Sequence, residues 1–236
     1  MKTKFFVLAM LLTISGNLMA QSITAERIRD WEERSLGGFY LGQNAGLGTP
    51  NGMSLNLYKS REIGFDLPVF DVNFSDKFVF HANLGFNWKN FRMTKNERSF
   101  VKDYTTGEVS IGQPNYYTSA LGTGQVDYSR MKIFSITLPF LFEYRFTESW
   151  FVAAGPVVNF NLHGSLLTKF TNDRGEHVVW RSNGLRQSVI TADLKLLFGH
   201  EDVAIYGRWS PCRQLRKRYA PELDFTGISF GIQAVL

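Results

Sequence analysis

The residues best suited to chemistry are His163 and Ser165, which Gly164 separates. A histidine can take the proton of a serine hydroxyl and activate it for acyl transfer when both side chains share one face. Residues two apart on a β-strand do share a face. No carboxylate that could orient the imidazole is evident in the sequence, so we predict no catalytic residues and keep this pair as an alternative.

A second cluster is basic and consists of Arg213, Arg216, Lys217 and Arg218. Arginine and lysine bind phosphate groups, so this segment could contact the surface of an anionic lipid. The competing interpretation is a solvated loop. Cys212 is the only cysteine, so the sequence predicts no internal disulfide, no Cys/His metal site and no cofactor.

A third set of charged and polar side chains occupies alternate positions within otherwise apolar segments. This set comprises Asp66, His81, Lys89, Glu143, Arg145, Asp193, Lys195 and Arg208. Both signs of charge occur, so the members can form ion pairs if the fold encloses them.

The elements that carry these residues have the pattern of β-strands. Every second residue is apolar over residues 134–144, and the same parity resumes over 150–162 after a short turn at 146–149. Strict alternation of this kind predicts a hairpin. Strands of roughly 13 residues, tilted by about 40°, span about 25–30 Å, the thickness of a bilayer core. Similar patterns predict strands at 37–48, from 54 or 61 to 74 with a bulge beside Pro68, and at 78–89, 190–198, 203–210 and 228–236.

The connections between these eight strands are alternately short and long, with long loops expected at 90–130 and 166–186. This predicts an all-β fold, an eight-stranded antiparallel up-and-down transmembrane β-barrel with short periplasmic turns and long external loops. A soluble barrel would instead turn its apolar face inward. Glycines and charges on the polar face, and aromatic residues at both strand ends, favour the membrane barrel. The third set would then form a packed polar network in the lumen, and His163 and Ser165 would face that lumen.

The composition agrees with this class of fold. Of the 236 residues, 15% are aromatic, and no apolar run of about 18–20 residues exists, which excludes a membrane-spanning helix. Residues 1–20 are predicted as a secretory signal peptide, residues 21–36 as a periplasmic segment and residues 37–236 as the barrel domain. The net charge of +5 falls to +3 without Lys2 and Lys4, which does not favour nucleic acid as a partner.

Residues 136–144 (ITLPFLFEY) and 152–156 (VAAGP) resemble the hairpin of the PorT-like, OmpA-like outer-membrane β-barrel family of Bacteroidetes-type bacteria. Residues 229–236 (SFGIQAVL) resemble the C-terminal signal that the barrel-assembly machinery reads, with Leu236 in place of the usual aromatic residue. The resemblance implies the outer membrane of a Gram-negative bacterium, and PorT-like members are linked to type IX secretion. The His-x-Ser pair is similar to that of outer-membrane lipid A deacylases, which must present it to lipid.

These features predict a non-enzymatic integral outer-membrane protein with a structural, adhesive or scaffolding role through its external loops. The first alternative is a narrow pore or a type IX secretion accessory protein, and the second is a lipid A-modifying hydrolase. The expected partners are outer-membrane lipid, the barrel-assembly machinery and lipopolysaccharide, whose phosphates the basic segment at residues 213–218 would contact. The protein is expected to be a monomer.

Overall fold

The computed structural model describes residues 35–49, 53–94, 98–103, 105–112, 116–119, 122–221, 223 and 225–236. The predicted signal peptide, residues 1–20, lies outside the described residues. Residues 21–34 of the predicted periplasmic segment also lie outside them. No helix within the described ranges is long and apolar enough to cross a membrane.

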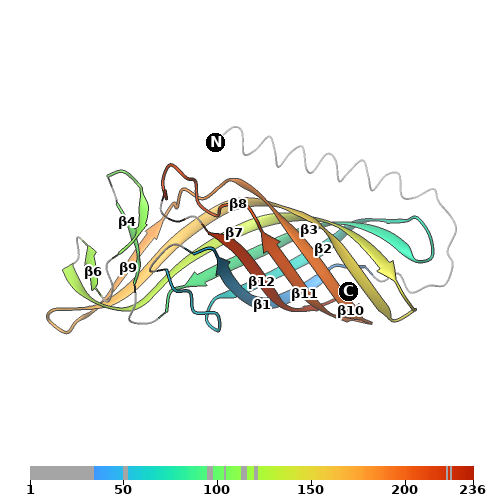
Figure 1. The fold of residues 1–236 in the computed structure, drawn as a ribbon, viewed down its shortest axis with the longest axis horizontal. Helices are drawn as coiled ribbons and strands as arrows, with labels where there is room; N and C mark the ends of the chain where they lie inside the picture. Colours follow the sequence, from blue (N-terminus) through green and yellow to red (C-terminus); the bar gives the residue numbers. More distant parts are fainter. Residues whose placement is uncertain are drawn as a thin grey trace.

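The described chain forms twelve β-strands (Figure 1). Their bounds are β1 Gly38–Leu47, β2 Arg61–Asn73, β3 Phe78–Arg92, β4 Phe100–Lys102, β5 Val109–Ile111, β6 Tyr116–Ser119, β7 Gly122–Arg145, β8 Trp150–Asn172, β9 His177–Asn183, β10 Ile190–His200, β11 Val203–Ser210 and β12 Thr226–Ala234. The two longest, β7 and β8, form the central hairpin that the alternating pattern predicts.

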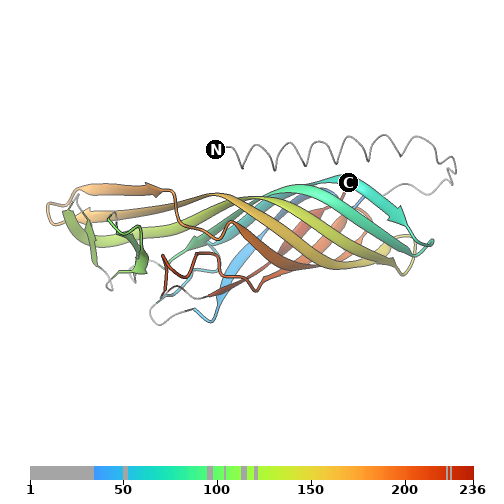
Figure 2. The same cartoon turned by 90° about the horizontal axis from the view of Figure 1, so that it is seen from above.

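Eight of these strands close into one antiparallel barrel (Figures 1 and 2). The neighbours follow in the order β7, β3, β2, β1, β12, β11, β10 and β8, and β8 pairs back with β7. The pairing of β12 with β1 runs from Tyr40↔Gln233 to Leu47↔Thr226. This confirms the predicted eight-stranded barrel, in which closure leaves no unpaired edge among the eight strands.

The two ends of the barrel differ. The turns at residues 74–77, 146–149 and 201–202 are short and lie at the end where β1 starts and β12 finishes, which we call the turn end. The longer connections lie at the opposite end, the loop end. At the turn end, the Ser35 amide donates to the Leu236 carbonyl at 3.0 Å, and the Leu236 amide donates to the Gly37 carbonyl at 3.3 Å.

The apolar face of each strand points outward. On β10, the Leu196 side chain is 53% exposed while its neighbour Lys195 is 1% exposed, and Arg208 on β11 is 2% exposed. Water-soluble proteins have the opposite arrangement, because exposed apolar surface of this extent is unfavourable in water. The outer face therefore requires lipid, as the sequence predicts for a membrane barrel.

Aromatic rings mark both edges of this apolar face. Phe78 and Tyr144 have ring centres 4.8 Å apart near the turn end, and Trp88 and Phe134 have ring centres 4.8 Å apart near the loop end. Trp88 lies ten positions after Phe78 in β3. With a rise of about 3.3 Å per residue and a tilt of about 40°, the two edges lie about 25 Å apart, which matches an outer-membrane hydrocarbon layer.

The bulge predicted beside Pro68 is present, because the register of β2 against β3 shifts between Pro68 and Phe70. The predicted loops at 90–130 and 166–186 are wrong in part. β7 starts at Gly122, β8 continues to Asn172, and β9 pairs with the outer part of β8. These parts lie beyond the lipid-facing belt, so they do not need the alternation of apolar residues from which the other strands were predicted.

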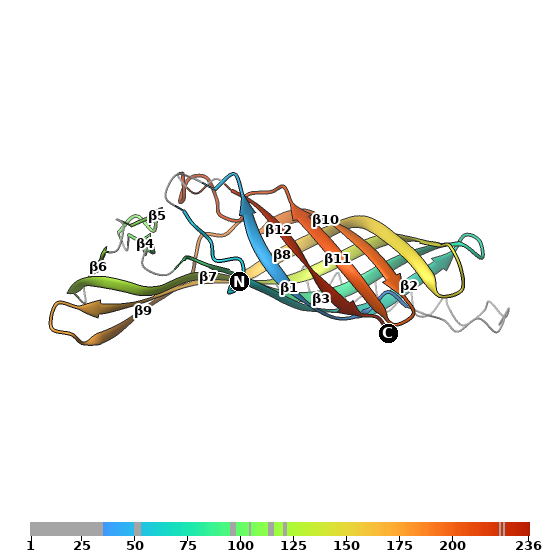
Figure 3. The same ribbon diagram turned by 60° about the horizontal axis from the view of Figure 1, so that its bottom comes forward.

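The strands beyond the barrel form a projecting unit, which we call the head (Figure 3). The head consists of β4, β5, β6, β9, residues 122–131 of β7 and residues 165–172 of β8. β4 and β5 pair as a small hairpin, while β6 pairs with β7. The head continues the barrel wall on one side only, so it extends well past the loop end.

Candidate functional site

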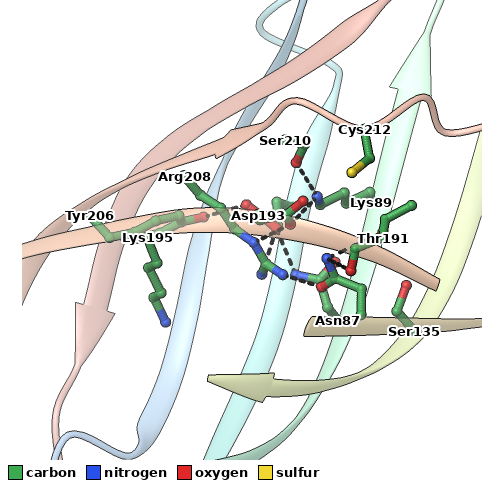
Figure 4. Close-up of polar contacts among 12 residues, drawn as sticks. Asn87, Lys89, Ser135, Thr191, Asp193, Lys195, Tyr206, Arg208, Ser210 and Cys212 are labelled. Atoms are coloured by element: carbon green, nitrogen blue, oxygen red, sulfur yellow. Dashed lines mark hydrogen bonds and ion pairs between the residues drawn. The ribbon is translucent and has the colours of Figure 1, made fainter. Parts of the chain in front are cut away.

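The middle of the lumen contains a buried cluster of ion pairs centred on Arg208 (Figure 4). Arg208 donates from Nε to Asp193 Oδ2 at 2.6 Å and from Nη1 to Glu62 Oε1 at 3.3 Å. Lys89 Nζ donates to Asp193 Oδ2 at 2.8 Å and to Ser210 Oγ at 2.7 Å. Hydrogen bonds that accompany each charge offset part of the cost of removing it from water.

A second ion pair extends the cluster toward the turn end. Lys195 Nζ lies 2.8 Å from Asp66 Oδ2 and 4.4 Å from the centre of the Tyr40 ring. Glycines on the lumen face leave the space for these side chains. A Cβ at Gly64 would overlap the Tyr40 ring, and a Cβ at Gly85 would overlap Asp66 Oδ1. The middle of the lumen is therefore filled by side chains.

The turn end of the lumen is closed by a third polar group and an apolar layer. His81 Nδ1 lies 2.8 Å from Asp71 Oδ1, and His81 Nε2 lies 2.7 Å from Glu143 Oε2. Arg145 Nε donates to Glu143 Oε1 at 3.0 Å. Buried apolar and aromatic side chains fill this end, namely Leu36, Tyr40, Leu141, Phe151, Ala153, Leu197, Ala204, Tyr206 and Val235.

The structure places the eight predicted lumen residues in two groups. The first group is the central cluster, to which Asp66, Lys89, Asp193, Lys195 and Arg208 belong; the second lies at the turn end and contains His81, Glu143 and Arg145. The central cluster also contains Glu62 and Tyr40, which were not predicted from the sequence. Glu62 lies on the same face of β2 as Asp66. The alternation did not show where this strand begins, so Glu62 was not predicted to belong to the cluster.

The prediction that His163 and Ser165 face the lumen is wrong, because the pair lies on the outer face. Phe134 pairs with His163, but the next residue, Ser135, pairs with Asn161. One extra residue of β8 therefore lies between these two pairs and inverts the alternation. Beyond this bulge, residues that would have faced the lumen face outward, so His163 is exposed.

His163 and Ser165 share a face, as predicted, but no catalytic arrangement surrounds them. Within the described residues, no hydrogen bond joins the two side chains, and their cross-strand neighbours are Phe134, Lys132 and Asn183. None of these neighbours is a carboxylate that could orient the imidazole. The described ranges also contain no group of three His, Cys, Asp or Glu side chains placed to hold a metal ion.

The predicted basic segment lies in the connection between β11 and β12 at the loop end. Arg216, Lys217 and Arg218 are exposed, while Arg213 is half-buried. The Arg218 guanidinium lies 5.7 Å from the centre of the Tyr219 ring. The three exposed cations are accessible to an anion from the solvent side.

The β4–β5 hairpin of the head has a well-defined turn. Asp103 Oδ1 accepts hydrogen bonds from the Thr105 amide at 2.6 Å and from the Thr106 amide at 3.1 Å. The backbone N–H groups of Thr106 and Thr105 hold the pKa of the Asp103 carboxyl below its usual value. Gly107 adopts a φ of 73°, which favours glycine in this turn.

The closed strands, the lipid-facing outer surface and the polar lumen define a transmembrane β-barrel of the outer-membrane type. The chain belongs to the outer membrane protein β-barrel domain family, whose sequence model matches residues 19–201. The protein is thus an integral protein of the outer membrane of a Gram-negative bacterium, with its turn end periplasmic and its loop end external.

No curated protein sequence matches this chain. Among solved structures, the chain is similar to Ail, the attachment invasion locus protein of Yersinia pestis, in complex with the heparin analogue sucrose octasulfate. The TM-score is 0.38 and the sequence identity 10%, over 85% of this chain and 97% of that chain.

Proposed function

We propose that the protein is a non-enzymatic membrane anchor that presents its external head for adhesion or scaffolding. The observation that carries this proposal is the length of the central hairpin. β7 has 24 residues and β8 has 23, whereas about 9–11 residues of a tilted strand suffice to cross a bilayer. The surplus projects outside the membrane and pairs there with β6 and β9.

The head and the neighbouring loops share an apolar core, which supports a role as a rigid contact surface. Its buried members are Met53, Phe91, Met93, Phe100, Val109, Val126, Met131, Ile133, Leu166, Phe170, Trp180, Leu185, Leu215, Ala220, Leu223 and Phe225. The Phe100 amide also donates to Ser129 Oγ at 2.9 Å, which attaches β4 to β7. An ordered external surface loses less conformational entropy when it binds a partner than a flexible loop does.

Shortening the head is expected to cause a several-fold loss of adhesion. Lys169 and Val179 are cross-strand partners in β8 and β9. Replacing residues 170–178 by Asn-Gly would connect them through a two-residue turn. Cells that display this variant and cells that display the intact protein would be compared for attachment to surfaces coated with extracellular-matrix proteins and for cell–cell aggregation.

The matched control places the same Asn-Gly sequence at residues 201–202, in the periplasmic turn between β10 and β11. This control should attach like the intact protein. A heat-dependent shift in gel mobility would verify that both variants fold. Equal attachment by the shortened and intact proteins in every assay would overturn the proposal.

The narrow-pore alternative can be tested by conductance. We expect no unitary current steps when the pure protein is inserted into a planar bilayer, because ion pairs and apolar side chains fill the lumen. A porin in the same bilayer is the positive control. Regular steps from the pure protein would favour the pore.

The remaining alternatives have less support. A type IX secretion accessory role rests on the hairpin motif at residues 136–144 and 152–156. A lipid A hydrolase would gain from the outward position of His163 and Ser165, but it would need an orienting carboxylate that their cross-strand neighbours do not supply. Insertion by the barrel-assembly machinery, a monomeric state and contact of residues 213–218 with lipopolysaccharide are parts of the proposal.

A further inference from the structure

A hollow of about 530 Å³ opens on the outer wall of the barrel, where β7, β8 and β9 meet. Its lining includes Arg130, Lys132, Phe134, His163 and Arg181. At this level β8 exchanges one neighbour for another, since it pairs with β10 as far as residue 160 and with β9 from residue 165. The hollow therefore lies where the barrel ends and the head begins.

Basic side chains form a row across this wall, with Leu167 between two of them and Arg92 next to the hollow. Arg92 of β3 pairs with Arg130 of β7. Arg130 pairs with Leu167 of β8, which in turn pairs with Arg181 of β9. Lys132 lies two residues from Arg130 and so shares its face. Directly paired residues are about 5 Å apart, so the row of side chains extends over about 15 Å.

These cations have no carboxylate partner in the part of the chain that the structure describes. No ion pair among the described residues involves Arg92, Arg130, Lys132 or Arg181. The guanidinium groups of Arg92 and Arg130 instead lie 4.0 and 5.8 Å from the centre of the Tyr128 ring. Like charges on neighbouring strands repel each other, and an anion placed among them would relieve that repulsion.

The depth of the hollow matches the headgroup layer of the external leaflet. Trp88 and Phe134 mark the outer edge of the lipid-facing belt and form the side of the hollow nearest the membrane. Lys132 and Arg130 precede Phe134 by two and four residues in β7, so they lie nearer the loop end. With a rise of about 3.3 Å per residue and a tilt of about 40°, they stand about 5–10 Å above that edge.

We propose that this basic hollow binds the phosphate groups of lipid A, the phosphorylated anchor of lipopolysaccharide in the outer leaflet. Arginine and lysine are the side chains that bind phosphate best. A row about 15 Å long is wider than one phosphate and suits a sugar headgroup that carries a phosphate at each end. Phe134 and Trp88 below the cations provide an apolar wall for the acyl chains. The site is separate from residues 213–218, and binding here does not depend on adhesion by the head.

The proposal can be tested by native mass spectrometry of the full-length barrel released from detergent. The probes are bis-phosphorylated lipid A, the same lipid A without phosphates, and phosphatidylglycerol. The test variant is Arg130→Gln/Lys132→Gln/Arg181→Gln. The matched control, Lys59→Gln/Lys77→Gln/Arg174→Gln, removes the same charge from exposed positions outside both basic clusters. Gel mobility with and without heating would show that each barrel is folded, and Arg181→Gln alone replaces the triple variant if that variant does not fold.

We expect the wild-type protein and the matched control to retain bis-phosphorylated lipid A. The triple variant should bind it at least about tenfold more weakly, since one lost charge-assisted hydrogen bond is worth about a factor of ten. Three results would each overturn the proposal: equal binding by the triple variant, equal binding of the dephosphorylated lipid, or equal binding of phosphatidylglycerol. Loss of binding by Arg216→Gln/Lys217→Gln/Arg218→Gln, with the triple variant unchanged, would place the lipid site at residues 216–218 instead.

Discussion

Replacing Arg208 by methionine is expected to lower the free energy of unfolding by about 3–5 kcal/mol. Methionine has a similar length but no charge, so Asp193 would lose one of its two cationic partners and Glu62 would lose its ion pair. The side chain also donates to Tyr40 Oη and to Asn159 Oδ1. All of these groups lie in the lumen, where water cannot readily replace the lost contacts.

The measurement is reversible urea unfolding of the barrel in lipid vesicles, followed by tryptophan fluorescence. Arg216→Met removes the same charge from an exposed loop position and should change the free energy by less than about 0.5 kcal/mol. The double variant Arg208→Met/Glu62→Gln should regain part of the loss, because it also removes an uncompensated carboxylate. A loss as small as that of Arg216→Met would contradict a tightly packed ionic lumen.

Replacing Gly64 by valine is expected to destabilise the barrel by about 1–3 kcal/mol through overpacking. A Cβ at this position would overlap the Tyr40 ring. That ring has little freedom to move, because Asn87 Nδ2 donates to its hydroxyl at 2.8 Å and the Lys195 ammonium lies above its face. The valine would therefore displace several members of the lumen network.

Gly207→Val provides a control on the opposite face of the barrel wall. No atom lies within 4 Å of a Cβ built at Gly207, so valine should be accepted there or should stabilise the strand slightly. Unfolding of the double variant Gly64→Val/Tyr40→Leu would measure the coupling directly. The cost of Gly64→Val should fall when the ring is absent, and a cost that stays the same would show that the overlap is not its cause.

The outward position of His163 shows that alternation of apolar and polar residues does not predict the face of a side chain beyond a bulge. Parity along a strand assigns each side chain to a face only while the register is continuous. The bulge beside Pro68 was predictable because Ile63, Phe65 and Leu67 visibly give way to the other parity. At the bulge in β8, apolar and polar residues continue to alternate through Leu162 and His163. The sequence therefore shows no change of parity there, although the pairing with β7 shifts by one residue.

The sequence also does not predict which charged side chains form ion pairs with each other in the lumen. Lys195 and Asp66 are separated by 129 positions in the chain, and Arg208 and Glu62 by 146. The sequence assigns Lys195, Asp66 and Arg208 to the polar face, but many pairings among such residues are possible. The pairing depends on the stagger and tilt of the closed barrel, which determine the height of each residue in the lumen.

The sequence by itself determined the class of fold, the number of barrel strands, the inverted polarity of the two faces and the short turns. These features follow from local alternation and turn residues, which are visible along a single strand. Only the tertiary structure decided the head, the outward turn of His163 and Ser165, and the row of cations from Arg92 to Arg181. The physical reason is that these features depend on register between strands, and one bulge changes which side chains meet.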